Sequence, residues 1–250
     1  MKKIIAIVFV LGVSFFSVFS NGKEKQINVP KASSNITVDG KLDEKCWQKS
    51  PVHTFNHFYN VDKPTDKQTA TFRMLWDDVN LYLFYQCNDQ YITAREKVWD
   101  GAPYLDDCAE IFILPTTDKI NMHFGYELNL YKVANDFVFL NDFYKNERIA
   151  VKAYNPDYEV AVTIDGTLND NSDKDKGWTM EMAIPIKAFY TAGQLTPFSE
   201  GAVWRFIAVR QDRNDAEGER RSTSTNFPIH PKKVDVHDPK YFGLMKFVTE

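Results

Sequence analysis

The sequence is poor in cysteine, in basic residues and in the short motifs of common enzymes. Its three cysteines, Cys46, Cys87 and Cys108, are too few for a disulfide scaffold, and their spacing matches no zinc motif. The sequence leaves open whether any two of them pair. The 30 basic residues are outnumbered by 34 acidic ones and form no block, which excludes nucleic acid as a partner. No nucleophile elbow, phosphate-binding loop or zinc-hydrolase motif is present.

A long apolar run occurs only at the N-terminus. Lys2 and Lys3 precede the apolar segment 4–19, and Ser20 offers a small residue where a signal peptidase cuts. The run is shorter than the roughly 20 residues that span a bilayer, and no later segment could span one. We therefore predict that residues 1–20 are a signal peptide and that residues 21–250 form one exported domain, periplasmic or secreted. Loss of two lysines changes the net charge from −4 to −6.

Alternation of apolar and polar residues predicts a mainly β domain. The 44% apolar content can build a core, and turn residues separate short segments in which every second residue is apolar. This pattern is typical of an all-β, antiparallel β-sandwich. The predicted strands are Ala70–Trp76, Leu81–Cys87, Ala109–Leu114, Tyr126–Tyr131, Glu159–Ile164, Trp178–Ile184, Val203–Arg210 and Phe242–Val248. Only Leu42–Gln48 and Ile186–Tyr190 favour short helices.

The strand around residue 110 carries an unusual charge. Alternation places Ala109 and Ile111 in the core and turns Glu110 to the other face. A buried carboxylate without a partner is costly, so Glu110 lies either in solvent or in a binding site. Trp99 and Tyr104 precede it, and aromatic rings beside a carboxylate suit the apolar faces and hydroxyl groups of a sugar. The alternative, in which both rings pack on the sandwich edge, stays open.

A second acidic segment lies at residues 38–44. Asp39 and Asp43 flank a tight turn at Gly40 and can cap the following short helix. The same carboxylates could bind calcium, which prefers several oxygen ligands. The capping role is favoured, and calcium is the alternative.

Four blocks of the sequence together resemble the family 9 carbohydrate-binding modules and their DOMON-like relatives. They are residues 36–44 with Trp47, residues 70–89, residues 107–113 and residues 237–243, in the order expected for that family. The resemblance implies a jelly-roll β-sandwich, often with structural calcium. It also implies binding of an oligosaccharide or polysaccharide, with the sugar between two tryptophans in the best-known members.

The resemblance transfers to this chain only in part. Tyr104 stands at the family's aromatic position before the carboxylate strand, with Trp99 nearby. The second ring would fall near Val236, which is not aromatic, so the sequence represents a divergent member. The carbohydrate-binding residues that follow are Tyr104, Glu110, Trp99, Asp107, Glu127 and Arg210, and the calcium residues are Asp39 and Asp43.

Two other functions remain as alternatives to non-catalytic glycan capture. A glycan hydrolase needs two carboxylates about 5 to 9.5 Å apart, and Glu110 with Glu127 on a neighbouring strand could meet that distance. DOMON-like relatives include haem-binding redox modules with methionine and histidine ligands. His123, Met122 and Met180 offer such groups, although methionines in alternating strands usually belong to the core.

The predicted signal peptide gives the first testable prediction. Because the apolar run is short and ends on Ser20, the mature chain should begin near Asn21. N-terminal sequencing of exported protein measures this directly, and an intact Met1 in a membrane fraction would contradict it.

Overall fold

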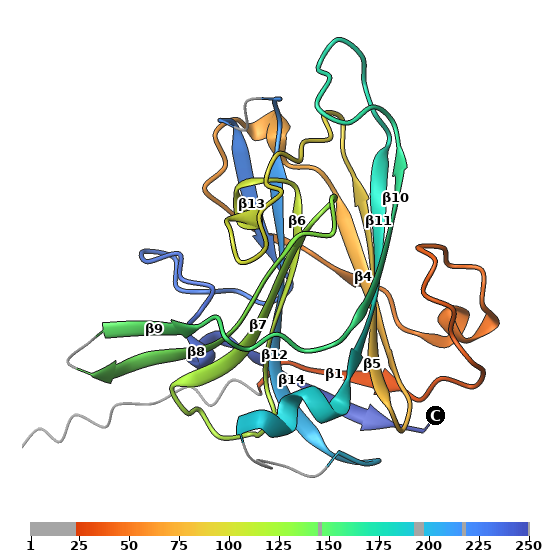
Figure 1. Cartoon of the computed structure of the whole chain (residues 1–250), viewed down its shortest axis with the longest axis vertical. Helices are drawn as coiled ribbons and strands as arrows, with labels where there is room; N and C mark the ends of the chain where they lie inside the picture. Colours follow the sequence, from red (N-terminus) through yellow and green to blue (C-terminus); the bar gives the residue numbers. More distant parts are fainter. Residues whose placement is uncertain (1–23, 145–146, 193–197, 217–218, 250) are drawn as a thin grey trace, which may run out of the picture.

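The protein folds as two facing β-sheets, as the sequence predicts. The computed structural model describes residues 24–144, 147–192, 198–216 and 219–249, so the predicted signal peptide lies outside the described residues. Figure 1 shows the two sheets packed face to face, with the β8–β9 hairpin projecting from one of them. Within the described residues, no helix is long and apolar enough to cross a membrane.

The larger sheet contains nine strands in the described part of the chain. Seven follow the order β1 (Gln26–Pro30), β14 (Gly243–Val248), β12 (Val203–Arg213), β6 (Cys108–Leu114), β7 (Met122–Asn129), β8 (Ala134–Tyr144) and β9 (Glu147–Val151). Two short strands, β13 (Arg221–Thr225) and β3 (His57–Tyr59), extend the sheet from β12. The pairing of β1 with β14 is parallel, and the other pairs are antiparallel.

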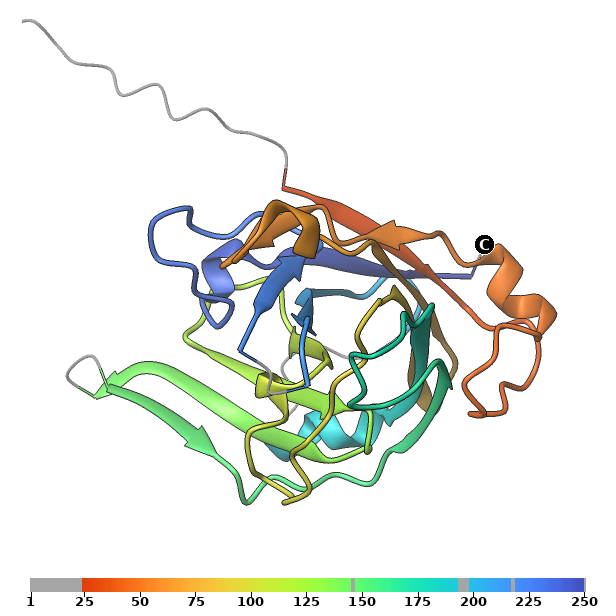
Figure 2. The same ribbon diagram turned by 90° about the horizontal axis from the view of Figure 1, so that it is seen from above.

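The smaller sheet contains five described strands and covers the inner face of the larger one. Its order is β10 (Glu159–Asp165), β11 (Gly177–Pro185), β5 (Asn80–Asn88), β4 (Ala70–Trp76) and β2 (His53–Thr54). Five 3₁₀ helices connect described strands: η1 (Lys45–Lys49), η2 (Pro64–Asp66), η3 (Pro103–Leu105), η4 (Ile186–Ala192) and η5 (Pro239–Tyr241). Figure 2 shows the two layers from above.

All eight predicted strands are present, with small shifts at their ends. The strand predicted to reach Tyr131 ends at Asn129, because the Asn129 side-chain oxygen accepts the N–H groups of Tyr131 and Val133 and closes a turn. The strand predicted to end at Arg210 continues to Arg213. The two predicted helices are short 3₁₀ helices, and strands β1, β2, β3, β8, β9 and β13 were not predicted.

Strand alternation divides the larger sheet into two faces. Ala109, Ile111 and Ile113 of β6 join the main core between the sheets, as predicted. Phe112 of the same strand faces outward, where Ile207 and Val209 of β12 join it. The segment 229–242 covers this outer group through Ile229, Val234, Val236, Tyr241 and Phe242. The outer face therefore carries a second layer of packing beside the strands that bear Glu110 and Glu127.

The three cysteines are buried and unpaired in the structure. Cys46 lies in a small apolar cluster against Leu75 and Phe84, away from the main core. Burial raises the pKa of the Cys87 and Cys108 thiols, so these two stay protonated and unreactive at neutral pH.

A buried ion cluster joins the two sheets at one end of the sandwich. The Arg210 guanidinium on β12 lies 3.1 Å from the Asp89 carboxylate and 3.3 Å from that of Asp212. Arg210 also donates to the Asn88 carbonyl at the end of β5, and the Trp178 indole donates to Asp89. Both ion pairs are fully buried, and such pairs depend on every member being present. The cluster therefore ties β12 of the larger sheet to β5 and β11 of the smaller one.

Replacing Arg210 tests this connection. Arg210→Met leaves Asp89 and Asp212 buried without their cation, which should cost about 3–5 kcal/mol of unfolding free energy. Arg148→Met is the matched control, because the Arg148 side chain is 51% exposed in its pair with Asp235. Loss of such a surface pair costs about 0–1 kcal/mol. Urea denaturation measures both, and equal effects of the two substitutions would contradict the role of the cluster.

Candidate functional site

A pocket opens on the outer face of the larger sheet. Its volume is about 290 Å³, and side chains from β6, β7, β8 and β12 form its floor. Its lining residues are Tyr104, Glu110, Glu127, Asn135, Phe137, Phe139, Ala150, Lys152, Gln211, Val236 and His237. Because two buried carboxyl groups occupy the floor, we refer to it as the glutamate pocket.

Four neighbouring strands each contribute one polar side chain to the floor. In the antiparallel register, Glu110 of β6 lies directly opposite Glu127 of β7. Glu127 in turn lies opposite Asn135 of β8, whose amide nitrogen donates to the Glu127 carboxyl at 2.7 Å. Gln211 of β12 lies on the other side and accepts a hydrogen bond from the Thr223 hydroxyl. Strand pairing therefore sets Glu110, Glu127 and Asn135 in one row, and Gln211 lies diagonally to Glu110, two residues beyond its direct partner Val209.

The two carboxyl groups are held in an environment that disfavours charge. Burial raises the pKa of Glu110 to about 7, although a hydrogen bond from Gln211 and the charge of Arg213 act in the opposite direction. Burial and the neighbouring Glu110 charge raise the pKa of Glu127 well above its ordinary value. Like charges directly opposite each other on a sheet repel. At neutral pH, the pair therefore keeps at least one proton.

One carboxyl oxygen of this pair has no protein partner. Glu110 Oε1 is buried and accepts no hydrogen bond from the described residues. An unpartnered buried oxygen costs free energy that a donor from a ligand would recover. The floor therefore offers an unfilled acceptor at Glu110 beside the donors and acceptors of Gln211, Glu127 and Asn135.

Aromatic rings form the walls of the glutamate pocket. His237 stacks on Phe139 with ring centres 4.6 Å apart and lies 3.2 Å from His123 through their ring nitrogens. Burial lowers the pKa of His237 to about 4, so the ring is neutral at pH 7 and acts as an aromatic wall. The Tyr104 side chain is 41% exposed at the mouth of the pocket. The Arg213 guanidinium donates a hydrogen bond to the backbone carbonyl of Tyr104.

The structure brings together three of the six predicted sugar-binding residues. Tyr104, Glu110 and Glu127 line the glutamate pocket, and the predicted outward direction of Glu110 is confirmed. Trp99 lies outside the pocket, 48% exposed, with its indole N–H bonded to Asn155.

Asp107 and Arg210 do not reach the glutamate pocket. Arg210 follows the inward alternation of Phe206 and Ala208 on β12, so its side chain enters the space between the sheets. The Asp107 carboxylate accepts the backbone N–H groups of Thr93 and Arg213 and is fully buried. Both side chains therefore bond to groups of the protein outside the glutamate pocket, and sugar contacts at these two positions stay a prediction.

Four polar lining residues were not predicted. Gln211 lies one residue beyond the predicted end of its strand, and Asn135 belongs to β8, which was not predicted at all. Lys152 and His237 reach the pocket from connecting segments. The alternation of Asn135, Phe137 and Phe139 is a signal that could have identified β8. No local pattern could have identified Lys152 or His237, because only the fold brings their segments to this sheet.

The acidic turn at residues 38–44 is held by protein groups. The Asp39 carboxylate pairs with the Lys41 ammonium group at 2.9 Å and accepts the Lys41 backbone N–H. Neither aspartate caps η1, which begins after Glu44 and has no side-chain cap. The Glu181 carboxylate, in contrast, accepts the N–H groups of Asp39, Gly40 and the Trp47 indole.

These contacts bear on the expected calcium site. The Asp39 carboxylate would have to leave the Lys41 ammonium group to act as a calcium ligand. Among the described residues, three carboxylates approach within 4.8 Å of one another only at Asp89, Asp107 and Asp212, where Arg210 already supplies a cation. Calcium at Asp39 and Asp43 stays a prediction.

The residues considered as haem ligands do not converge. His123 faces the outer side of the larger sheet and stacks near Phe112 and Phe139. Met180 lies in the main core, on the smaller sheet. Because the larger sheet separates these side chains, they cannot ligate one iron atom.

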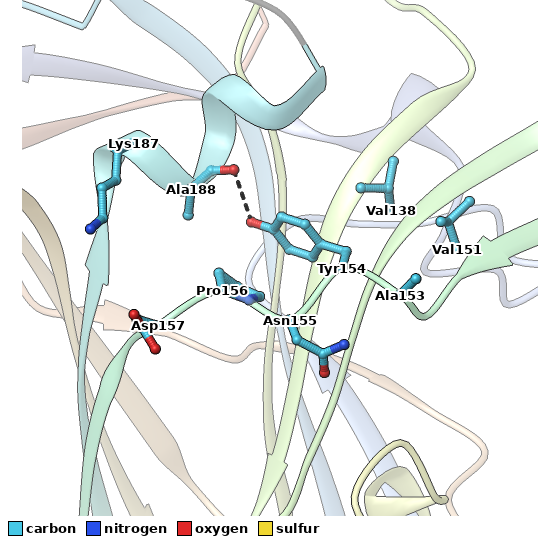
Figure 3. A pocket seen from close by; sticks show the side chains of 9 residues that line it. All are labelled: Val138, Val151, Ala153, Tyr154, Asn155, Pro156, Asp157, Lys187 and Ala188. Carbon is cyan, nitrogen blue, oxygen red and sulfur yellow. Dashed lines mark hydrogen bonds between the residues drawn. The ribbon is translucent and has the colours of Figure 1, made fainter.

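A larger cavity lies on the other side of the β8–β9 region. Its volume is about 670 Å³, and it is bounded by β8, the segment after β9 and η4. Its lining residues are Val138, Val151, Ala153, Tyr154, Asn155, Pro156, Asp157, Lys187 and Ala188 (Figure 3). The Tyr154 hydroxyl forms hydrogen bonds with the Tyr126 hydroxyl and with the Ala188 carbonyl, so its hydrogen-bonding groups are already used within the protein. We refer to this space as the Tyr154 cavity.

Comparisons with known proteins bear on the family and the fold of the chain. Residues 38–250 match the family described as carbohydrate family 9 binding domain-like. A family 9 carbohydrate-binding module from Caldicellulosiruptor kristjanssonii, solved with glucose, is 16% identical with a TM-score of 0.62, covering 90% of this chain and 97% of that one. The same values of identity and TM-score hold for that module with cellotriose, covering 90% of this chain and 95% of that one.

A third solved structure is similar over the same length. It is a putative carbohydrate-binding protein from Bacteroides uniformis, 15% identical with a TM-score of 0.66, covering 90% of this chain and 99% of that one. No curated protein matches the chain. At these identities, the solved structures establish a shared fold.

The carboxyl pair makes stability depend on pH. Glu110 loses its proton near pH 7 when folded and near its ordinary value of 4.5 when unfolded. Its contribution to stability is therefore fully present below pH 4.5 and is lost as the pH rises through 7. Glu110→Gln should raise stability at pH 8 by about 3 kcal/mol, or about 6–12 °C in the melting midpoint. At pH 4.5 the variant and wild type should melt together, and equal melting at both pH values would contradict the assignment.

Proposed function

The chain belongs to the carbohydrate family 9 binding domain-like family, and we propose that it is an exported, non-catalytic protein that captures an oligosaccharide or polysaccharide. The glutamate pocket is the proposed binding site. The observation that carries this proposal is the group of Gln211, Glu110, Glu127 and Asn135 on a pocket floor beneath aromatic walls.

The chemistry of the floor is complementary to a sugar. Sugar hydroxyl groups both donate and accept hydrogen bonds, so they can use the unpartnered Glu110 oxygen as an acceptor and the Gln211 amide as a donor. The Lys152 ammonium group at the side is a further donor, already bonded to the Asp100 carbonyl at 2.5 Å. The rings of Tyr104 and His237 suit the apolar faces of a sugar ring. The solved modules bound to glucose and cellotriose support the same ligand class.

The leader supports export to the periplasm or the cell exterior, where polymeric glycans are encountered. The basic start, the apolar segment 4–19 and Ser20 form the pattern of a cleaved signal. A protein of this kind would aid glycan degradation by holding the substrate for separate enzymes.

A hydrolase is the second candidate, because the carboxyl groups of Glu110 and Glu127 lie close together on neighbouring strands. Glu110 and Glu127 are directly opposite in register, which brings their β-carbons within about 5 Å of each other. Hydrolysis requires one carboxyl group on each side of the bond that breaks. Here both groups stand side by side on one floor, and both have a raised pKa. This arrangement favours ligand binding over bond cleavage.

Calorimetry on a sugar found by glycan array tests the site. Glu110→Gln should weaken binding about tenfold, since a lost charged hydrogen bond costs about 1.5–3 kcal/mol. Tyr104→Ala should weaken binding up to about tenfold, since it removes the ring that packs on the sugar face. Glu159→Gln and Tyr190→Ala are matched controls, because both side chains are exposed and lie outside the pocket. Binding by both pocket variants at the wild-type level would contradict the proposed site.

Incubation with the same sugars decides between the two candidates. Binding alone releases no new reducing ends from oligosaccharides. Turnover that is present in wild type and absent in Glu110→Gln would replace the binding proposal with the hydrolase.

A further inference from the structure

One loop beside the glutamate pocket exposes an unusual amount of apolar surface. Val98, Trp99, Tyr104 and Leu105 are 66%, 48%, 41% and 44% exposed, although large apolar side chains are usually buried. Tyr104 belongs to the pocket mouth. The Trp99 ring lies outside the pocket, and no other aromatic ring among the described residues packs on it.

The loop that carries Trp99 is firmly held. The Glu96 carboxylate accepts the backbone N–H groups of Lys97, Val98 and Ala102, so it ties both ends of the segment together. The Asp106 carboxylate accepts the Glu96 N–H, and the Asn129 amide donates to the Glu96 carbonyl. These bonds fix the loop before any ligand binds.

A hydrogen bond at the edge of the Trp99 ring also fixes the orientation of the ring. Its indole N–H donates to Asn155 Oδ1 at 3.0 Å, and the Asn155 amide donates to the Lys152 carbonyl. A ring held by its edge keeps its faces available for stacking. The arrangement therefore presents a preorganised aromatic surface, which lowers the entropic cost of binding.

Contacts of this loop connect Trp99 to both cavities. The residue that follows it, Asp100, accepts the Lys152 ammonium group and donates its backbone N–H to Ala134, next to Asn135. Lys152 and Asn135 line the glutamate pocket. Asn155 lines the Tyr154 cavity, and Figure 3 shows its amide pointing away from Lys187 and Asp157. Trp99 and its neighbour Asp100 therefore bond to residues that line both cavities.

We propose that Trp99, held by Asn155, is the stacking face of a second sugar subsite, so that the ligand is an oligosaccharide rather than a single sugar. One sugar occupies the glutamate pocket, and the following units of the chain pass over the Trp99 ring. Sugar rings have an apolar face of C–H groups that packs against indole, as other apolar surfaces do. This inference rests on the proposed function and adds that the ligand must contain more than one sugar unit.

Titration calorimetry with sugars of increasing length tests the subsite. The probes are glucose, xylose and mannose with the three- and six-unit β-1,4-linked oligosaccharides of each. Wild type should bind the three-unit member of its preferred series about tenfold more tightly than the single sugar. Trp99→Ala should remove that gain and leave single-sugar affinity unchanged. Trp99→Phe, which keeps an aromatic face, should retain most of the gain, and Tyr190→Ala should match wild type.

The outcomes separate this inference from the proposed function. Equal affinity for short and long sugars, or a length gain that survives in Trp99→Ala, overturns the subsite while sugar binding stands. Loss of single-sugar affinity in a folded Trp99→Ala also overturns it, because the ring would then belong to the glutamate pocket. Absence of binding in all three series and on the whole glycan array overturns both proposals.

Discussion

The buried pairing of Arg210 with Asp89 and Asp212 controls more than the joining of the two sheets. Asp212 is followed by Arg213, whose backbone N–H is held by the Asp107 carboxylate at 2.7 Å. The Arg213 side chain then holds the carbonyl groups of Tyr104 and Leu105. A chain of polar contacts therefore runs from the space between the sheets to the mouth of the glutamate pocket, and the ion cluster supports the position of Tyr104.

Alternation of side-chain direction along β12 explains how one strand contributes residues both to the ion cluster and to the glutamate pocket. Arg210 and Asp212 point inward to the ion cluster, whereas Gln211 and Arg213 point outward to the pocket and its mouth. Because successive side chains of a strand point to opposite faces, a shift of one residue would exchange these roles. The two buried ion pairs oppose such a shift, since it would leave charges in the core without partners.

The two carboxyl groups of the glutamate pocket lower the stability of the fold but allow the pocket to bind hydroxyl groups. Two opposed carboxyl groups at the floor disfavour folding as the pH rises, because neither can ionise without cost. A fully apolar floor would be more stable but would offer no acceptor to a hydroxyl group. The neighbouring Gln211 and Asn135 moderate the cost by hydrogen bonding to the carboxyl groups. Around them, Phe139 and the neutral His237 keep the walls aromatic.

Local pattern determined the sandwich, eight of its strands and the outward direction of Glu110, because alternation is a property of neighbouring residues. The meeting of Glu110 with Glu127 required strand pairing, which joins residues 17 positions apart. The inward turn of Arg210 followed the strand's alternation, but its ion partner Asp89 lies 121 residues earlier in the chain. His237 and Lys152 reach the pocket through connecting segments that have no repeating pattern. Tertiary structure alone decided these contacts, because they depend on which strands pair and on how loops cross the sheet.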